Sequence, residues 1–397
     1  MKILLALTYF RPYVSGLTIY ADRLAQGLAK RGHDVTVLTS RDSSSLPVNE
    51  RSDRLRIVRL PVALRVSKGV IMPTYPVAAV RLARAHDLVN AHLPQLEAAP
   101  LAVVARLLRR PYVVTYHCDV TLPPGRFNRV AQRAVEEANR ISGVCAERVV
   151  AYTSDYAEHS RFLRRFARKV EIVAPPVTIP APAAAEVARF RVRHRLADGA
   201  GDSEESWPVI GLAARFAAEK GIEVVLAALP ELIKRFPRLK VLFAGPVEGV
   251  VGERAYLDRL EPQIRALGDR WAFLGSLDMQ RELPAFYAAL DCLLLPSLNS
   301  TESFGLVQVE AMLCGTPVVA SALPGVREPI RLTGMGEVVP VGDAAALASA
   351  VARVIEGGDR YVRARAEIES FFDLDRCVDT YEALFQDLLV ASGRPSR

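Results

Sequence analysis

The chain of 397 residues has few cysteines, and their arrangement excludes several kinds of protein. The five cysteines are odd in number and widely spaced, and none belongs to a CxxC pair. Disulfide frameworks and structural zinc sites use cysteines in even numbers or at close spacing, so neither is expected. Cysteines of this kind favour a reducing compartment.

Long hydrophobic runs are also absent from the sequence. No apolar segment approaches the roughly 18 residues that a membrane-spanning helix needs. The first residues, MKILLALTYFRP, lack the length and the small-residue cleavage site of a signal peptide and are typical of a first strand. We therefore expect a soluble, cytoplasmic protein.

What the sequence does contain is enough apolar material for two domains. Half of the residues are hydrophobic and 24% are charged, and the length favours two domains of roughly 180–200 residues. Residues 1–178 hold 27 Lys and Arg against 14 Asp and Glu, whereas the remainder holds 24 against 30. A basic first half suggests an anionic partner; anionic lipid or a phosphorylated acceptor is favoured, and a solvated basic surface is the alternative.

The densest basic cluster lies near the end of the basic half. It could touch acidic lipid or an acceptor, and a solvated helix face is the equal alternative. Its members are Arg161, Arg164, Arg165, Arg168 and Lys169.

Two series of alternating strand and helix patterns run along the chain. Apolar runs separated by helical segments predict βαβ units and parallel sheets. The first series predicts a helix at residues 18–31 and strands at 2–7, 35–39, 88–91, 111–116, 148–151 and 170–173. The second predicts strands at 209–213, 240–244, 271–273, 291–295, 317–320 and 336–339.

Composition marks the boundaries between these series. Residues 175–182, PPVTIPAP, are the most proline-dense stretch and predict an inter-domain linker. We expect a first domain over residues 1–178 and a second over residues 179–372. A final helix within 373–397 is expected to cross back to the first domain, and the acidic insert 197–206 is expected to be a mobile surface loop.

The most informative segment is residues 296–317, PSLNSTESFGLVQVEAMLCGTP. It follows the apolar run 291–295, which predicts a buried strand, and its apolar half predicts a helix that ends near Gly315. Glu310 lies inside this apolar helix, where an unpaired carboxylate would be costly, so a polar partner is expected. Glu302 lies in the loop before the helix, whose N-terminal amides favour an anionic ligand.

Two other segments place polar side chains directly after predicted strands. Arg215 and Lys220 follow a strand of the second series, and His117 and Asp119 follow one of the first. Ligands of parallel α/β sheets bind at the carboxyl ends of the strands, so both segments are candidates for a site. Arg and Lys together suit a diphosphate. Surface cations and a structural histidine are the alternatives.

Residues 302–311, ESFGLVQVEA, resemble the E-x7-E motif of the retaining GT-B glycosyltransferases of family 4, including its internal Phe-Gly. The flanking segments DCLLLPS and AMLCGTPVVAS resemble the same family, and the likeness runs through the whole chain. The resemblance implies an α/β GT-B fold, in which two Rossmann-like domains with parallel sheets face each other across a cleft.

The resemblance also implies roles for the matching side chains. Glu310 would hold the ribose hydroxyls of the donor nucleotide, and Glu302 would contact the hydroxyls of the donor sugar. Arg215 and Lys220 would neutralise the leaving nucleoside diphosphate. On the first domain, His117 would contact the sugar or the acceptor, with Asp119 as a candidate beside it.

Backbone positions complete the implied donor site. The family usually has two adjacent glycines before the first helix; this chain has Ser15-Gly16, so only Gly16 carries over as a phosphate contact. The amides around the Phe-Gly pair would serve the sugar and diphosphate, and the segment after strand 271–273 would meet the nucleobase. These positions are Phe304, Gly305, Leu306, Gly275, Ser276, Leu277 and Gly245.

Two patterns that suggest cofactors are set aside. The segment GPVEGVVG is not GxGxxG, and no acidic residue follows it at the dinucleotide-binding distance, so NAD is not expected. Asp373-Leu374-Asp375 spells the DxD that signals a metal in a different glycosyltransferase fold, but here it opens a helix, where Asp is a common cap. No metal or other cofactor is expected beside the nucleotide-sugar substrate.

The sequence therefore predicts a hexosyltransferase that moves a sugar from a nucleotide-diphosphate donor to a hydroxyl acceptor with retention of configuration. Front-face attack by the acceptor is the expected mechanism. The acceptor class is a lipid or cell-envelope glycan precursor, met at the inner face of the membrane, and no nucleic acid is expected. Two alternatives stay open: a sugar-nucleotide epimerase of the same double-Rossmann architecture, and a non-catalytic partner of a glycan-assembly complex.

Overall fold

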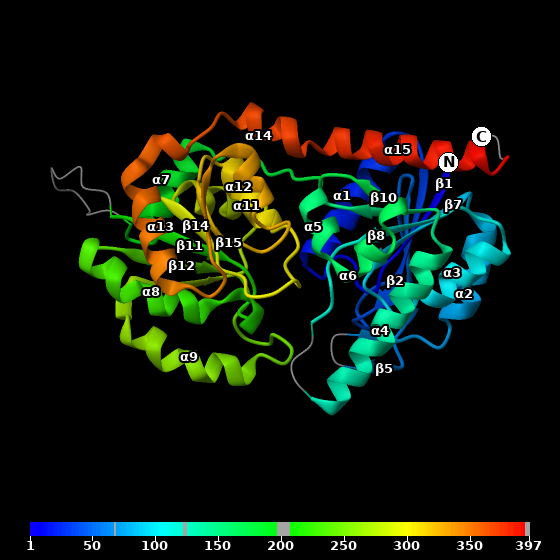
Figure 1. Cartoon of the computed structure of the whole chain (residues 1–397), viewed down its shortest axis with the longest axis horizontal. Coiled ribbons are helices and arrows are strands. Elements are labelled where there is room, and N and C mark those ends of the chain that lie inside the picture. Colours follow the sequence, from blue (N-terminus) through cyan, green and yellow to red (C-terminus); the bar gives the residue numbers. More distant parts are fainter. Residues whose placement is uncertain (67–68, 122–124, 197–206, 394–397) are drawn as a thin grey trace. The chain divides into compact units, whose positions relative to one another are not determined.

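The computed structural model describes residues 1–66, 69–121, 125–196 and 207–393. The chain forms two compact units (Figure 1). Unit 1 consists of Met1–Pro176 and Phe372–Arg397, and unit 2 of Val177–Phe371. The first break lies inside the proline-dense stretch. The acidic insert 197–206, predicted to be a mobile loop, lies outside the described residues.

Unit 1 is built on an eight-stranded sheet in the order β10-β9-β8-β7-β1-β2-β4-β3. All of its neighbours pair in parallel except β3 and β4, which are antiparallel. A separate hairpin pairs β5 (Leu64–Val66) with β6 (Gly69–Ile71). The strands of the sheet are β1 (Lys2–Ala6), β2 (Asp34–Arg41), β3 (Asn49–Ser52), β4 (Leu55–Pro61), β7 (Leu88–Leu93), β8 (Tyr112–Tyr116), β9 (Arg148–Ala151) and β10 (Val170–Ile172).

Helices cover both faces of this sheet, as its alternating side chains require. Val89, Ala91 and Val114 share one core with side chains of the helices α2 and α3. Thr115, on the opposite face, contacts Tyr381 of α15, which in turn contacts Tyr20 of α1. The helical segments of unit 1 are α1 (Gly16–Lys30), α2 (Tyr75–Ala85), α3 (Ala98–Leu107), α4 (Arg126–Cys145), α5 (Ser154–His159), α6 (Arg161–Arg165), η1 (Ala167–Lys169) and α15 (Leu374–Ala391).

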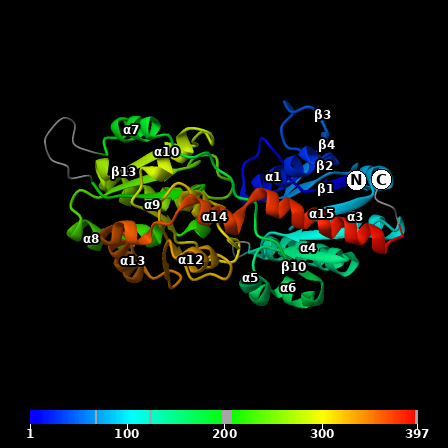
Figure 2. The same ribbon diagram turned by 90° about the horizontal axis from the view of Figure 1, so that it is seen from above.

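The C-terminal helix α15 belongs to unit 1 and lies over it (Figure 2). It packs on α1, where a Cβ atom on Gly27 would come within 2.5 Å of the Val378 side chain. Arg31, at the end of α1, forms ion pairs with Asp379 and Glu382 of α15. The absence of a side chain at Gly27 therefore lets the two helices approach closely.

Part of the basic cluster has a structural task. The Lys169 ammonium donates to the carbonyl oxygens of Gly143, Val144 and Ala146 at 3.1, 2.9 and 2.6 Å, which satisfies the C-terminal end of α4. The arginines of the cluster are exposed to solvent on α6 and η1. Only they are available to an outside partner.

Unit 2 contains a six-stranded parallel sheet in the order β13-β12-β11-β14-β15-β16. This order reverses between β11 and β14, as in the doubly wound α/β folds. The central strand β14 is buried along its whole length, because helices cover both faces of the sheet. The strands are β11 (Val209–Ala213), β12 (Lys240–Ala244), β13 (Trp271–Gly275), β14 (Cys292–Leu295), β15 (Val318–Ser321) and β16 (Gly336–Val339).

The helices of unit 2 alternate with these strands. Apolar side chains of α8, α9 and α13 share one core with β11, β12 and β14. The helical segments are α7 (Ala184–Arg193), η2 (Ala218–Lys220), α8 (Ile222–Arg235), α9 (Arg254–Ala266), η3 (Gly268–Arg270), α10 (Glu282–Ala288), α11 (Leu306–Leu313), α12 (Glu328–Thr333), α13 (Ala344–Gly357), η4 (Gly358–Tyr361) and α14 (Arg365–Phe372).

The predicted architecture of two doubly wound α/β units is confirmed, and every strand predicted from the two series is present. The strands β3, β4, β5 and β6 were not predicted. Within the described parts of the chain, each helix is too short or too polar to serve as a membrane span.

Candidate functional site

The switch point of the unit 2 sheet brings two predicted segments together. The strands β11 and β14 are neighbours there, with Ile210 opposite Cys292, and the loops that leave their carboxyl ends emerge at the same edge of the sheet. The loop after β11 carries Arg215 and Lys220, and the loop after β14 carries Glu302. A ligand-binding crevice is expected at this point of the sheet.

Lys220 and Glu302 meet directly, although 82 residues separate them in the sequence. The Lys220 Nζ and Glu302 Oε2 atoms are 2.5 Å apart, and both side chains are largely buried. Their loops also share a backbone hydrogen bond, in which the Leu298 amide donates to the Glu219 carbonyl at 2.9 Å. Gly221 permits this approach: its φ is +67°, and a Cβ atom would lie 2.1 Å from the Pro296 carbonyl oxygen.

Arg215 lies in the same loop and has a carboxylate partner of its own. Its guanidinium donates to Glu219, one turn further along. The Arg215 side chain is 36% exposed and that of Glu219 only 12%. The guanidinium therefore keeps an accessible surface beside the Lys220–Glu302 pair.

Backbone hydrogen bonds fix the Arg215 loop to the neighbouring strands. The Ala214 amide donates to the Ala244 carbonyl and the Phe216 amide to the Pro246 carbonyl, each at 2.9 Å. Gly245 has a φ of +138°, and a Cβ atom there would lie 1.9 Å from the Ala214 carbonyl oxygen. Only glycine fits such a close approach.

The predicted nucleobase segment adjoins Gly245. The Gly245 amide donates to the Gly275 carbonyl at 2.7 Å, which joins the ends of β12 and β13. Gly275 itself has a φ of +69° and open space where a side chain would be. Ser276 is exposed, and Gly275 and Leu277 are half-buried, so solvent reaches this segment.

Glu310 lies on α11, as predicted, and it is buried, with 3% of its surface exposed. The Tyr287 hydroxyl, on α10, donates to Glu310 Oε2 at 3.1 Å. This is a polar partner of the kind that burial of a carboxylate requires. Sequence reasoning could not identify Tyr287, because it lies on a different helix and in an apolar context.

The Phe-Gly pair shapes the start of the same helix. Gly305 is the N-cap of α11 with a φ of +76°, and a Cβ atom there would lie 2.4 Å from the Leu295 side chain. Phe304 is buried, and Leu306 opens the helix beside a half-exposed loop.

Unit 1 places Gly16 at the first position of α1, after the loop that follows β1. Ser15 is the N-cap: its hydroxyl accepts from the Thr18 amide at 3.2 Å, while its own amide donates to Thr18 Oγ1 at 2.8 Å. The serine that stands where the family has glycine therefore forms a capping box. Gly16 is exposed.

His117 is buried rather than open to solvent, with 4% of its surface exposed. Its Nε2 shares a hydrogen bond with His92 Nδ1 at 2.8 Å, and its Nδ1 contacts the Tyr152 hydroxyl. Burial lowers the pKa of His92 to about 3, and burial together with His92 lowers the pKa of His117 well below its usual range. Both imidazoles are therefore neutral at pH 7.

Asp119 is held in its loop by tyrosine and serine hydroxyls. Its Oδ1 accepts from the Tyr116 hydroxyl at 2.7 Å and from the Ser160 hydroxyl at 2.8 Å. Its amide donates to the Tyr156 hydroxyl at 2.7 Å. These contacts stabilise the loop after β8, and a role toward an acceptor stays a prediction.

A buried polar network that the sequence did not reveal lies next to His117. The Tyr381 hydroxyl of α15 shares hydrogen bonds of 2.8 Å with the Tyr20 hydroxyl and with Thr115 Oγ1. Asn90 donates to Thr115 Oγ1 at 3.0 Å. The signal that could have indicated it is the run of polar residues on two otherwise apolar strands, Asn90 and His92 on β7 and Thr115 on β8.

The predicted helix cap at the DxD sequence is confirmed, since Asp373 accepts from the Arg376 amide at 2.8 Å at the start of α15. Over the described residues, no three His, Cys, Asp or Glu side chains are grouped so as to hold a metal ion. Metal independence of the reaction stays a prediction.

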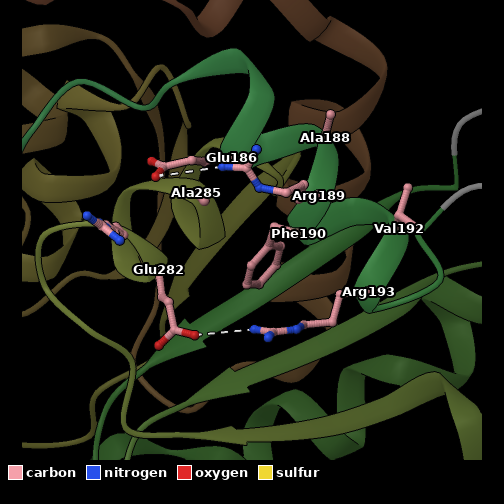
Figure 3. A pocket seen from close by; sticks show the side chains of 9 residues that line it. Glu186, Ala188, Arg189, Phe190, Val192, Arg193, Glu282 and Ala285 are labelled. Carbon is pink, nitrogen blue, oxygen red and sulfur yellow. Dashed lines mark hydrogen bonds and ion pairs between the residues drawn. The ribbon is translucent and has the colours of Figure 1, made fainter.

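A surface hollow of about 660 Å³ between α7 and α10 is separate from these residues (Figure 3). Arg193 faces Glu282 across it at 3.3 Å, and Phe190 forms part of its wall. None of the predicted site residues lines it.

The fold and the switch-point site define a class of enzyme: two doubly wound α/β units with cations and carboxylates at the strand ends are typical of GT-B glycosyltransferases. The family models agree. Residues 199–370 match the group 1 glycosyl transferases, and residues 15–176 match the glycosyl transferase 4-like domain. The chain belongs to this glycosyltransferase family. It is thus a hexosyltransferase-type enzyme that uses a nucleotide sugar, as the sequence predicts, and the epimerase alternative is not favoured.

Individual relatives support this assignment. The chain is 32% identical over 409 residues to the 2-deoxystreptamine N-acetyl-D-glucosaminyltransferase of Streptomyces fradiae, covering 96% of this chain and 92% of the relative. It is 30% identical to the D-inositol 3-phosphate glycosyltransferase of Xylanimonas cellulosilytica, covering 88% and 86%.

Solved structures share the fold at lower identity. HepE of Anabaena, crystallised with UDP and glucose, is 21% identical with a TM-score of 0.78, and the match covers 97% of this chain and 99% of that one. Sucrose-phosphate synthase of Thermosynechococcus elongatus is 24% identical with a TM-score of 0.74, covering 98% and 99%.

Proposed function

We propose that this glycosyltransferase is a retaining, metal-independent enzyme whose donor site is the switch point of unit 2. The observation that carries the proposal is the Lys220–Glu302 pair, 2.5 Å apart beside the Arg215 guanidinium. It joins two loops at the place where doubly wound sheets bind ligands. A cation for phosphate and a carboxylate for sugar hydroxyls are thereby side by side.

Each donor group has a proposed partner in this site. The Glu310 carboxylate would hold the ribose hydroxyls, and Glu302 would accept hydrogen bonds from the sugar. Arg215 and Lys220 would bind the diphosphate and stabilise its charge as it leaves, an effect of about 2.7–4 kcal/mol per donor in comparable sites. Backbone amides at Gly305 and Leu306 would add donors for the same charge.

The remaining predicted positions complete the proposal. Gly245, Gly275, Ser276 and Leu277 would present backbone to the nucleobase. On unit 1, Gly16, His117 and Asp119 stay predicted contacts for phosphate, sugar and acceptor.

Retention would follow from attack on the face that the diphosphate leaves. The sugar would pass through an oxocarbenium-like state. The negative charge of the departing diphosphate would stabilise the positive charge of this state. Since Glu302 is paired with an ammonium and is assigned to sugar hydroxyls, we do not assign it as a nucleophile. The proton of the acceptor hydroxyl would leave with the diphosphate oxygen.

The acceptor class is suggested by the relatives. Their printed activities concern 2-deoxystreptamine and D-inositol 3-phosphate, and both molecules are polyhydroxylated cyclohexane rings. We propose a cyclitol hydroxyl as the acceptor. An inositol lipid is the form that would also match the basic first half, and others among the relatives are named phosphatidyl-myo-inositol mannosyltransferases.

We also propose that the enzyme works in the cytoplasm, peripherally at an anionic membrane face. The support is the net charge of +13 over residues 1–178 and the exposed arginines Arg161, Arg164 and Arg168. Such a surface would bind anionic headgroups in a salt-dependent way. Co-sedimentation with phosphatidylglycerol vesicles, but not with phosphatidylcholine vesicles, is the expected result.

The donor site is tested by nucleotide binding. We expect one of UDP, GDP and ADP to raise the melting temperature of the protein. Glu310→Gln should weaken the binding of that nucleotide by about 10–100-fold, because charge-assisted hydrogen bonds contribute about 1.5–3 kcal/mol. Glutamine keeps an acceptor for Tyr287, so the fold is preserved. Glu356→Gln, an exposed change on α13, is the matched control. Equal binding by wild type and Glu310→Gln would remove Glu310 from the site.

The reaction is tested by turnover. Wild type is incubated with UDP-glucose, UDP-N-acetylglucosamine and GDP-mannose against 2-deoxystreptamine, myo-inositol 3-phosphate and phosphatidylinositol. NMR of the anomeric proton of the product should show the configuration of the donor. An inverted product, or dependence on added divalent metal, would contradict the proposal. Isomerised donor without acceptor would instead indicate an epimerase, and nucleotide binding without turnover a non-catalytic partner.

A further inference from the structure

We propose that Glu219 is an internal counter-ion that occupies Arg215 until the diphosphate replaces it, and that it thereby limits how tightly the nucleoside diphosphate product is held. This inference rests on the proposed donor site. It adds Glu219 to that site as a residue that competes with the diphosphate for Arg215 and forms no favourable contact with the sugar or the nucleotide.

The argument starts from the charges of the resting site. Its two cations are each paired with a carboxylate: Lys220 with Glu302, and Arg215 with Glu219. A diphosphate brings negative charge and needs cations that are free to receive it. At least one of the carboxylates must therefore yield its cation, or share it, when the donor binds.

The two carboxylates differ in what they can do afterwards. Glu302 is the proposed acceptor of sugar hydroxyl hydrogen bonds, so it keeps a favourable contact in the loaded site. Glu219 would stand close to the diphosphate on the shared cation Arg215 and would repel it. A like charge within about 4–6 Å destabilises a charged group, just as an opposite charge stabilises it. Glu219 would therefore weaken the binding of the diphosphate.

The backbone of the loop that carries Glu219 is held by contacts that do not involve the Glu219 side chain. Its backbone is fixed from outside: its carbonyl accepts from the Leu298 amide at 2.9 Å, and the preceding Ala218 amide donates to Glu253 Oε2 at 3.0 Å. Glu253 is buried, and so anchors the start of the 3-10 turn. These backbone contacts do not depend on the Glu219–Arg215 ion pair, and Lys220 has its own partner in Glu302, so exchange of the anion on Arg215 leaves both in place.

Exposure sets the direction of approach. Arg215 is three times as exposed as Glu219, at 36% against 12%. An incoming phosphate can reach the open edge of the guanidinium before the carboxylate leaves. Exchange of one anion for another is then possible in either direction, which favours product release after transfer.

The test compares binding of UDP, GDP, ADP and inorganic pyrophosphate, together with the matching monophosphates and nucleosides, by isothermal titration calorimetry. Glu219→Gln removes the charge and keeps the shape. We expect it to bind the active nucleoside diphosphate roughly tenfold more tightly than wild type, or about 1.4 kcal/mol, and pyrophosphate more tightly as well. The monophosphate should gain less, and the nucleoside should be unchanged. Product inhibition in turnover should strengthen by the same factor.

Controls separate this effect from a general change of charge or structure. Glu231→Gln makes the same charge change on the exposed side of α8, where Glu231 pairs with Lys234, and should bind like wild type. Glu219→Ala serves if the glutamine variant does not fold. Equal or weaker diphosphate binding by Glu219→Gln would overturn the inference, since Glu219 would then orient Arg215. No binding of any diphosphate by wild type would overturn the proposed donor site itself, and with it this inference.

Discussion

The buried histidine pair of unit 1 should make the stability of the enzyme depend steeply on pH below neutrality. His92 and His117 are hydrogen-bonded to each other and almost completely buried. Two of their neighbours, Tyr20 and Tyr152, have pKa values raised well above the usual range by burial, so both hydroxyls are uncharged at pH 7. Protonating either imidazole would place a positive charge in the buried interior, which costs free energy.

The direction and size of the effect follow from the two pKa values. In the unfolded chain each histidine binds a proton near pH 6.5, whereas the pKa of folded His92 is about 3 and that of His117 is well below its usual range. Stability is therefore unaffected above pH 6.5 and is lost as the pH falls below that value. Between pH 7 and pH 5 each histidine should reduce the free energy of unfolding by about 2 kcal/mol, and the pair by about 4 kcal/mol.

The assay is urea unfolding at pH 7, 6 and 5, followed by circular dichroism. His92→Asn and His117→Asn should each remove about half of the pH-dependent loss that the pair causes. Tyr152→Phe, which removes a hydroxyl but no imidazole, should lower stability without changing its pH dependence. Both tryptophans, Trp207 and Trp271, lie in unit 2, so their fluorescence monitors the other unit. If the pH dependence were the same in wild type and both asparagine variants, the histidines would titrate in the folded protein and the reasoning would be wrong.

Three further substitutions and one control variant test the structure by chemical denaturation. Gly221→Ala should lower the free energy of unfolding by at least about 2 kcal/mol, because the left-handed φ and the contact with the Pro296 carbonyl both oppose a side chain, and nucleotide affinity should fall as well. The control Gly268→Ala, at a φ of +56° but with open space around it, should lower it by only about 1 kcal/mol. Tyr381→Phe should cost about 1–3 kcal/mol, because its two hydroxyl partners lose a buried hydrogen bond; no loss would mean that the partners re-pair. Lys169→Met should cost about 1 kcal/mol by exposing the carbonyls at the end of α4, and an unchanged stability would show that solvent replaces the ammonium.

Much of the fold could be predicted from local patterns, and the strands that were missed show why some could not. The predicted strands are short apolar runs bounded by residues that interrupt the apolar pattern, as Asp291 and Pro296 bound β14. β4 was missed because arginines interrupt its sequence, LRIVRLP. Arg59 is nevertheless 2% exposed, since its guanidinium pairs with Glu50 of the antiparallel strand β3 at 2.9 Å. A local pattern cannot indicate that a partner elsewhere will neutralise a buried arginine.

The candidate site divides in the same way. The meeting of Lys220 with Glu302 follows from strand order, because the loops after neighbouring parallel strands emerge at one edge of the sheet. The partners of buried groups do not follow from it. Tyr287 reaches Glu310 from another helix, and His92 reaches His117 from the next strand. The structure buries His117, and its predicted contact with the sugar or the acceptor stays a prediction.

The placement of α15 has a consequence for how the enzyme is made. Residues 1–176 of unit 1 are translated before unit 2, whereas the helix that covers α1 around Gly27 is translated after unit 2. Unit 2 is continuous in sequence and can fold whole in the interval. During synthesis the face of α1 that receives Val378 and Tyr381 is therefore uncovered, and nascent chains stalled before residue 372 should be the form that chaperones recognise.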